Sequence, residues 1–422
     1  MIIIIIYIIL EIINWFKQLI MYINIIAPIP LKYSNSDITK IIDEMLKLDN
    51  KDLEYLIKGY ILYDKLNHTK PDLNTFNIKD MSRTEIKHLL SFSIYCNSNS
   101  NSNNHKDNDK LLSQLEQKLG FEFKDNNNNR YLYRRWGQDF FNFSFRPLLF
   151  KVLIKIFINT IHYYMIYILK YEYTVCNDSK IGFLHKKRDP SKKDLMFIHG
   201  FGFSYAPYIQ KLLHLNKKYN LILIILPNIS STTYYQKHNK YFVPHNVIKN
   251  TVYNFLDKAG IKKINILSHS FGTYITRIIM NDARNNVIDK VILFDPIIFW
   301  VGSTKMTLYL EHEITKTGTY LTYVYELFIT HLIYKCLYLK YICFRTMFGP
   351  DFWIYNVSDL VGICNTMIVL EYDDLVIPTD TLYKDMNGKH VNHYYLSDAS
   401  HGSVLLNSKF NDVFREIITF YD

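Results

Sequence analysis

The sequence is poor in the residues that build metal centres and disulfide frameworks. Its 422 residues include only five cysteines, Cys96, Cys176, Cys336, Cys343 and Cys364, and no two of them form a CxxC pair. An odd number of widely spaced cysteines is not typical of a zinc site or of a disulfide-rich fold. We therefore expect no metal, and we expect reduced thiols in a catalytic domain that faces the cytosol.

Glycine is also scarce, and compact blocks of basic residues are nearly absent. The chain has 14 glycines against 35 tyrosines and 27 phenylalanines, a bias typical of AT-rich coding sequence. Its net charge of +10 would suit a nucleic-acid partner, but the lysines are scattered. The densest basic run, residues 185–193, reads as a solvated turn between strands. We expect no nucleic-acid partner, because attraction to anionic lipid headgroups explains the charge equally well.

A long apolar stretch opens the chain at residues 1–28. A membrane-spanning helix needs about 20 predominantly apolar residues, so this stretch is long enough to span. Glu11, Asn14 and Gln18 share one helical face with Lys17 nearby, a pattern that also permits an interfacial helix. No positive charge precedes the run and no small-residue cleavage site follows, which argues against a secretory signal. We interpret it as a membrane anchor; the alternative is a helix packed on the protein's own surface.

The next part of the chain, residues 29–146, is predicted to be helical and rich in low-complexity tracts. Two Asn-rich tracts, 96–110 and 124–129, cannot bury apolar surface and are expected to be loops around a helix at 111–120. The apolar segment 147–170 is expected to form a second helix. It either contacts a membrane or covers the domain that follows.

From residue 171 to residue 422 the pattern changes to short apolar strands that alternate with helices. Residues 171–187 read as a β-hairpin. The later strands are continuously apolar, and a long helical insertion at about 299–360 separates the fourth of the alternating strands from the last two. Such alternation is typical of the α/β class, with a mostly parallel sheet covered by helices on both faces.

Ser270 lies between a predicted strand and a predicted helix, in the sequence Ser268-His269-Ser270-Phe271-Gly272. This is the setting of a nucleophile elbow, G-x-S-x-G, in which the residues flanking the sharp turn must be small. Gly272 fits the motif, whereas Ser268 replaces its first glycine and could alter the elbow. The alternative is that Ser270 only caps the following helix.

A second turn could supply donors for an oxyanion. His199, Gly200, Phe201 and Gly202 follow the strand at 194–198, and the glycines allow the backbone to approach a ligand closely. We predict that the backbone N–H groups of Phe201 and Phe271 would form an oxyanion hole. The alternative is an ordinary glycine turn.

Candidates for a general base and its orienting acid follow the last two strands. His401 is the candidate base among 15 histidines, and Asp374 is preferred to its neighbour Asp373 because of its distance from Pro378. The order serine, aspartate, histidine along the chain is the order seen in hydrolases of this class. His269, beside the serine, is not assigned as the base.

These motifs in this order resemble the α/β-hydrolase superfamily over about residues 171–422. The resemblance implies a Ser270–Asp374–His401 triad and hydrolysis of an ester, thioester or amide without a metal or organic cofactor. The insertion at 299–360 would be a cap, and it resembles the cap of membrane-associated hydrolases of fungi and protists, where a Phe-Trp segment precedes Asp-Leu.

The predicted function is a membrane-associated serine hydrolase that cleaves an acyl ester, with a lipid as the expected substrate class. Two alternatives stay open. One is a non-catalytic hydrolase fold used as an interaction module, which would be favoured if the histidine and aspartate did not converge on the serine. The other is an acyltransferase that uses the same residues. The oligomeric state cannot be read from the sequence.

Overall fold

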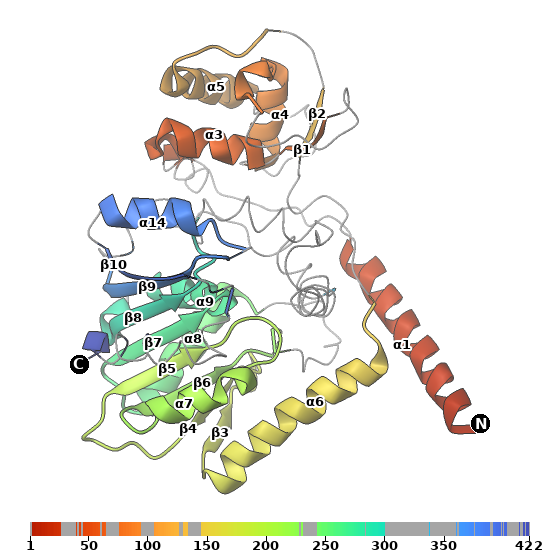
Figure 1. Cartoon of the computed structure of the whole chain (residues 1–422), viewed down its shortest axis with the longest axis vertical. Coiled ribbons are helices and arrows are strands. Elements are labelled where there is room, and N and C mark those ends of the chain that lie inside the picture. Colours follow the sequence, from red (N-terminus) through yellow and green to blue (C-terminus); the bar gives the residue numbers. More distant parts are fainter. Residues whose placement is uncertain are drawn as a thin grey trace.

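A computed structural model shows how the chain folds (Figure 1). The structure describes these residues: 2–26, 39, 42–43, 45–59, 61–64, 76–93, 105–125, 130–133, 145–227, 229–230, 243–282, 284–299, 337, 360, 363–374, 376–388, 391–397, 399, 401–402, 413, 417 and 419–421.

A single large sheet organises the C-terminal part of the described chain. Its eight strands follow the order β10-β9-β8-β7-β5-β6-β4-β3. The strands are β3 (Glu172–Val175), β4 (Gly182–His185), β5 (Asp194–Ile198), β6 (Asn220–Ile225), β7 (Ile264–His269), β8 (Ile288–Phe294), β9 (Asn365–Glu371) and β10 (Asn392–Leu396). The pairs from β6 through β10 are parallel, whereas β3 pairs with β4 and β4 pairs with β6 in antiparallel fashion.

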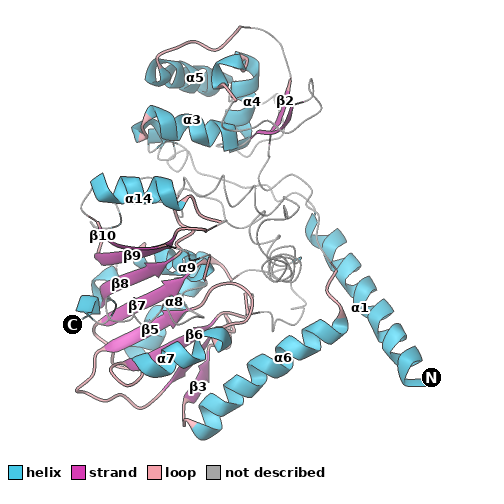
Figure 2. Ribbon diagram, in the orientation of Figure 1, coloured by secondary structure: helices cyan, strands magenta, loops and turns pink. Residues whose placement is uncertain are grey.

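Helices cover both faces of this sheet, as Figure 2 shows. They are α7 (Ile209–Leu215), α8 (His245–Lys258), α9 (Phe271–Met280) and α14 (Thr379–Gly388), with 3₁₀ turns η3 (Ala206–Tyr208) and η4 (Asn285–Val287). Alternate residues of one strand point to opposite cores: Met196 and Ile198 pack with α8, α9 and α14, whereas Leu195 and Phe197 pack with α7. Strands buried on both faces explain the continuous apolar runs of the sequence.

The α/β class and the hairpin at its start are confirmed. β3 and β4 pair in register from Glu172 with His185 to Val175 with Gly182. The predicted cap lies outside the described residues except for Phe299, Leu337 and Leu360, which are buried. The predicted final helix is also mostly outside them. Its described residues Val413, Ile417 and Tyr421 are buried in the core that contains α7, and that core is therefore completed by the C-terminus.

A smaller unit with its own core precedes the large sheet (Figure 1). It contains α3 (Asn50–Gly59), β1 (Ile61–Asp64), η1 (Ile78–Asp80), α4 (Arg83–Ser93), α5 (His105–Leu119) and β2 (Tyr131–Tyr133). Two findings differ from the sequence prediction. The antiparallel pair β1–β2 was not anticipated, and α5 begins at His105, inside the tract 96–110 that was expected to be loop. Helix α5 can extend that far because Asn108 is buried and donates to Ser91 Oγ at 2.7 Å.

Two apolar helices flank the large sheet domain: α1 (Ile2–Ile26) and α6 (Leu148–Tyr163), the latter extended by the π-helical turn η2 (Tyr164–Ile168). Both are long and apolar enough to cross a membrane by length and composition. The polar residues of α1 contact the start of α6. Glu11 accepts the Leu148 N–H at 2.7 Å, and Asn14 and Gln18 each donate to the Arg146 carbonyl at 3.0 Å. The polar face of α1 therefore caps the next apolar helix.

Candidate active site

Ser270 occupies a sharp turn between β7 and α9. Its backbone has φ 50° and ψ −119°, a conformation that costs a non-glycine residue about 1–3 kcal/mol. The Ser270 N–H donates to the Phe294 carbonyl at the end of β8, at 2.9 Å, which ties the turn to the neighbouring strand. The strained turn lifts the serine to the carboxyl end of the sheet, where the loops of such folds gather.

The two small residues that flank the turn have different environments. A Cβ on Gly272 would lie 2.2 Å from the Ile198 carbonyl oxygen, so only glycine lets α9 approach β5 this closely. Ser268, where the motif has glycine, is fully buried within β7. Its Oγ has no hydrogen-bond partner among the described residues, so the hydroxyl is tolerated at a cost in desolvation.

Ser270, His401 and Asp374 form a hydrogen-bonded line. Ser270 Oγ lies 2.8 Å from His401 Nε2, and His401 Nδ1 lies 2.7 Å from Asp374 Oδ2. The Asp374 carboxylate can only accept, so in the neutral ring Nδ1 carries the proton and Nε2 is left to accept from the serine hydroxyl. Asp374 Oδ1 accepts the N–H groups of Val376 and Ile377 at 2.6 and 2.9 Å, which fixes the carboxylate. The exposed Asp373 makes no such bond to His401.

Burial and charge act on His401 in opposite directions. Burial lowers the pKa of His401, but the nearby carboxylates of Asp374, Asp295 and Glu371 outweigh it and raise the pKa to about 9. A raised pKa means that the ring binds a proton strongly once it has been received. This property suits a group that must take a proton from a hydroxyl.

The turn from His199 to Gly202 lies against the serine. A Cβ on Gly200 would come within 3.3 Å of Ser270 Cβ, so the backbone of this turn and the serine are neighbours. His199 is buried, its Nδ1 bonds to the Gly200 carbonyl at 2.7 Å, and burial lowers its pKa to about 4. It therefore supports the turn as a neutral residue.

The two predicted oxyanion donors lie side by side. The rings of Phe201 and Phe271 meet edge to face with centroids 6.4 Å apart. Among the described residues, the Phe201 N–H donates to no acceptor, whereas the next N–H, of Gly202, donates to the Ile229 carbonyl at 2.8 Å. Phe271 is the first residue of α9, where backbone N–H groups point out of the helix. The two aromatic rings are therefore neighbours, and the oxyanion role of the two N–H groups stays a prediction.

Two further buried residues, neither predicted to take part in the chemistry, lie beside the base. His269 Nδ1 pairs with the Tyr208 hydroxyl at 2.9 Å, and its ring centroid lies 5.4 Å from that of His401. Asp295, just after β8, accepts the Gly402 N–H at 2.9 Å. The only sequence signal for Asp295 is its position: an aspartate directly after an apolar parallel strand.

The carboxylates and the histidine could in principle hold a cation. Asp295, Asp374 and His401 offer ligand atoms within 4.8 Å of one another. However, both ring nitrogens of His401 are engaged, one by Ser270 and one by Asp374. The arrangement therefore fits proton transfer from the serine better than metal coordination.

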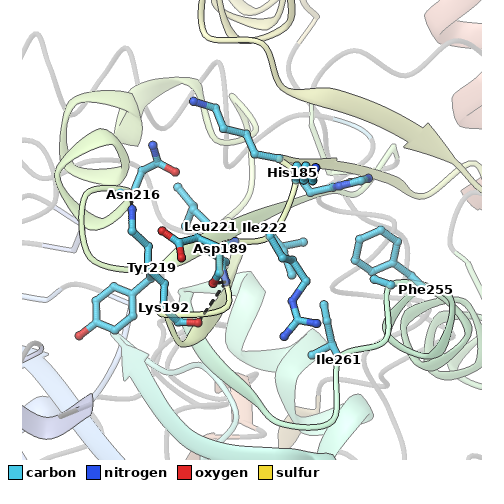
Figure 3. Close-up of a pocket in the computed structure, with 14 residues that line it drawn as sticks. His185, Asp189, Lys192, Asn216, Tyr219, Leu221, Ile222, Phe255 and Ile261 are labelled. Carbon is cyan, nitrogen blue, oxygen red and sulfur yellow. Dashed lines mark hydrogen bonds between the residues drawn. The ribbon is translucent and has the colours of Figure 1, made fainter.

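A cavity of about 170 Å³ lies at the opposite edge of the sheet, at the amino ends of β5 and β6 (Figure 3). Its lining is basic, and two of its cationic side chains, Arg188 and Lys192, already have partners. Arg188 binds Asp194 at 2.9 and 2.5 Å, and Lys192 Nζ donates to the Asn216 carbonyl at 3.3 Å. Ser270 stands at the carboxyl end of β7, so this cavity is separate from the candidate site.

No protein-family model and no curated protein matches the chain. Solved structures similar to it include a carboxylesterase from the thaumarchaeon Nitrososphaera gargenis, with 13% identity and a TM-score of 0.42 over 59% of this chain and 98% of that chain. A carboxylesterase from Bacillus subtilis has 10% identity and a TM-score of 0.44 over 64% of this chain and 98% of that chain. A serine hydrolase from Cycloclasticus zankles has 14% identity and a TM-score of 0.43 over 59% and 98%.

The chain's own architecture defines its class. A mostly parallel sheet covered on both faces carries a serine on a sharp strand-to-helix turn at its carboxyl edge. An acid follows β9 and a histidine follows β10, in the chain order serine, aspartate, histidine. The chain therefore has the α/β-hydrolase fold.

Proposed function

We propose that the protein is a serine hydrolase that cleaves carboxylic esters, with Ser270 as nucleophile, His401 as general base and Asp374 as the orienting acid. The observation that carries this proposal is the hydrogen-bonded line from Ser270 Oγ through His401 to Asp374. A hydroxyl is a poor nucleophile unless a base accepts its proton, and here the base already contacts it. This convergence argues against a purely non-catalytic role.

The proposed reaction has two halves. Ser270 Oγ attacks the ester carbonyl carbon while its proton passes to His401 Nε2, and the carbonyl oxygen becomes an oxyanion near the Phe201 and Phe271 N–H groups. The proton then goes to the leaving alcohol, and an acyl-Ser270 ester remains. Water attacks this ester, His401 takes the water's proton, and the acid is released as Ser270 recovers its proton.

We further propose that the enzyme works at a membrane and that its substrate is an acyl lipid. Helix α1 has 25 residues, and at about 1.5 Å per residue it exceeds the roughly 30 Å of a hydrocarbon core. The large apolar side chains on its surface, from Ile4 to Ile23, are 40–63% exposed, with the exposed Lys17 among them. On α6, Leu149, Leu153 and Ile156 are 55–56% exposed. A pair of adjacent helices with this much uncovered apolar surface is suited to lipid.

Helix α6 also adjoins the candidate site. Its buried residues Ile154 and Ile158 pack with Ala206 and Phe203, just after the turn that holds Phe201. His162 Nδ1 pairs with the Tyr205 hydroxyl at 3.0 Å. An apolar helix beside the oxyanion turn would bring a bilayer close to the reacting serine, which supports a lipid substrate.

A fluorophosphonate probe tests the nucleophile. The full chain in detergent should be labelled, and Ser270→Ala should not, because the probe reacts only with an activated serine hydroxyl. Ser191→Ala is the matched control, since Ser191 is an exposed serine at the opposite edge of the sheet and should be labelled like wild type. Equal labelling of wild type and Ser270→Ala would sink the assignment.

Vesicle flotation tests the membrane proposal separately. Replacing Leu153 and Phe157 on the exposed side of α6 by glutamate should reduce flotation with phospholipid vesicles and hydrolysis of a long-chain ester embedded in them. Hydrolysis of a soluble short-chain ester should be unchanged. Leu132→Glu, an equally apolar and 46% exposed position in β2, is the control. Undiminished flotation of the α6 variant would contradict the role given to α6.

A further inference from the structure

Asp295 is a fully buried carboxylate that the proposed reaction does not use directly. It follows β8, it is 0% exposed, and its backbone has φ 43°, in the left-handed region that non-glycine residues rarely adopt. The Asp295 N–H donates to the Val369 carbonyl at 3.0 Å, so the strained residue is held between β8 and β9. Burial of a charged group in a strained backbone needs specific compensation.

Each oxygen of Asp295 has a backbone donor. Oδ1 accepts the Glu371 N–H at 3.2 Å, and Oδ2 accepts the Gly402 N–H at 2.9 Å. Glu371 ends β9, and Gly402 directly follows His401. One carboxylate therefore connects the end of a rigid strand to the turn that carries the general base.

The turn of His401 and Gly402 is closely packed. Gly402 has φ +73°, and a Cβ there would lie 3.0 Å from the His269 ring. His269 in turn pairs with the Tyr208 hydroxyl, and its Nε2 lies 3.7 Å from Asp295 Oδ2. Tyr208, His269 and Asp295 thus form a second row of polar groups beside the row Ser270, His401 and Asp374.

We propose that Asp295 is a positioning residue for the proposed hydrolysis: it holds Gly402, and with it the His401 ring, in line with Ser270, and it places a second negative charge beside that ring. The inference rests on the proposed function for its rate readouts. Asp374 makes the direct bond to His401 Nδ1, whereas Asp295 acts through the backbone and through its charge.

The titratable groups that face His401 come from several elements: Asp374 after β9, Glu371 at the end of β9, Asp295 after β8 and His269 at the end of β7. Burial lowers the pKa of His401, and Asp374, Asp295 and Glu371 together raise it. Burial lowers the pKa of His269, so this neighbour adds no positive charge near neutral pH. Removal of the Asp295 charge should therefore make His401 lose its proton at lower pH.

Asp295→Asn separates charge from shape. The asparagine has one acceptor oxygen and one NH₂ group, so it cannot accept from both Glu371 and Gly402. We expect the plateau rate of fluorophosphonate labelling to fall about tenfold or more, the effect of misplacing a reacting group. The pH midpoint of labelling should also move down by about 1 to 2 pH units, as expected for loss of a nearby charge at an effective dielectric constant of about 20.

Asp194→Asn is the matched control, because Asp194 is another buried carboxylate in the same sheet, bonded to Arg188 at the opposite edge. It should leave the midpoint unchanged. If Asp295→Asn does not fold, Asp295→Glu keeps the charge but displaces it, and should lower the plateau with the midpoint kept. A profile of Asp295→Asn that matches wild type, or one that matches Asp194→Asn, would overturn the positioning role.

An NMR readout keeps this test independent of catalysis. The proton between His401 Nδ1 and Asp374 should give a downfield resonance that His401→Gln removes. In Asp295→Asn this resonance should weaken or titrate at lower pH, whether or not the protein hydrolyses esters. If the wild type is neither labelled nor active but Asp295→Asn still changes the resonance, the proposed function is rejected and the role of Asp295 in holding the ring stands. An unchanged resonance would reject that role.

Discussion

Two buried aspartates at opposite edges of the same sheet have different partners, an arginine for Asp194 and a histidine for Asp374, and the partner decides whether the pair can transfer a proton. At the amino edge, Asp194 binds Arg188 through both oxygens, and Arg188 also donates to the Gly260 carbonyl at 3.0 Å. At the carboxyl edge, Asp374 uses one oxygen for backbone N–H groups and the other for His401. Both carboxylates are buried and fully bonded.

The two partners differ in whether they can exchange a proton. A guanidinium keeps its protons, so the Arg188–Asp194 pair can only fasten the turn between β4 and β5. An imidazole can gain and lose a proton, and His401 has its second nitrogen on the Ser270 hydroxyl. A buried aspartate therefore stabilises a turn at the amino edge, whereas at the carboxyl edge it orients a histidine that can transfer a proton.

The largest expected effect comes from breaking the carboxyl-edge pair. In Asp374→Asn the side-chain amide would face His401 Nδ1 with the wrong hydrogen-bonding group or force the wrong tautomer. We expect kcat/KM for a short-chain ester to fall by about 10³ to 10⁴-fold. Asp194→Asn should leave kcat/KM within about twofold and cost about 1 kcal/mol of stability, since the Arg188 side chain is 40% exposed. Similar kinetic losses in both variants would remove the distinction between the edges.

The glycines at the two edges should also differ. Gly272→Ala would place a Cβ 2.2 Å from the Ile198 carbonyl oxygen, so α9 and β5 must separate. We expect a loss of about 3 kcal/mol or more in the free energy of unfolding, together with loss of probe labelling. Gly260→Ala has open space around its Cβ and suffers only from its φ of +65°, so it should cost about 1 kcal/mol. Urea titration measures both.

The two edges should respond differently to pH. His401 must be unprotonated to accept the serine proton, so the acylation rate should rise about tenfold per pH unit below the His401 pKa and level off above it. Because the His401 pKa is raised to about 9, its stabilising effect is complete below the ordinary histidine pKa of about 6.5 and is lost as pH rises through 9.

Denaturant midpoints measured across that range check this stability effect. His401→Gln should lose the pH-dependent part of stability between those limits, whereas Arg188→Gln should lower stability by the same amount at each pH. A labelling rate that falls as pH rises through this range would contradict the role of His401 as base.

The smallest expected effect concerns Ser268, whose hydroxyl has no partner among the described residues. Ser268→Ala removes a buried, unsatisfied hydroxyl, so stability should increase by about 1 kcal/mol. Activity should stay within about twofold, because the Ser270 backbone is held by Phe294 and by α9 rather than by the Ser268 side chain. Thermal unfolding and ester hydrolysis measure the two quantities. A large loss of activity would contradict this prediction, because it would mean that the Ser268 hydroxyl is needed for the reaction.

Much of the fold was predictable because it depends on local patterns. Continuous apolar runs such as 195–198 and 221–225 are typical of strands buried on both faces, and turn residues mark their ends. The same strand-end logic pointed to Ser270, Asp374 and His401, and the distance to Pro378 favoured Asp374 over Asp373. Pair β1–β2 was missed because both strands are short and lie on either side of long helices. Helix α5 was placed too late because its first residues are in a polar, Asn-rich tract.

The sequence by itself determined the alternating α/β pattern, the apolar helices α1 and α6, and which polar residues end the strands. The tertiary structure alone decided which of these polar residues meet. Asp295 reaches Gly402 across 107 residues, and Asn14 reaches the Arg146 carbonyl across 132 residues. Hydropathy and periodicity record which face of an element is buried. Hydrogen bonds between distant residues depend instead on backbone direction at a few positions, such as φ 43° at Asp295, that no local pattern specifies.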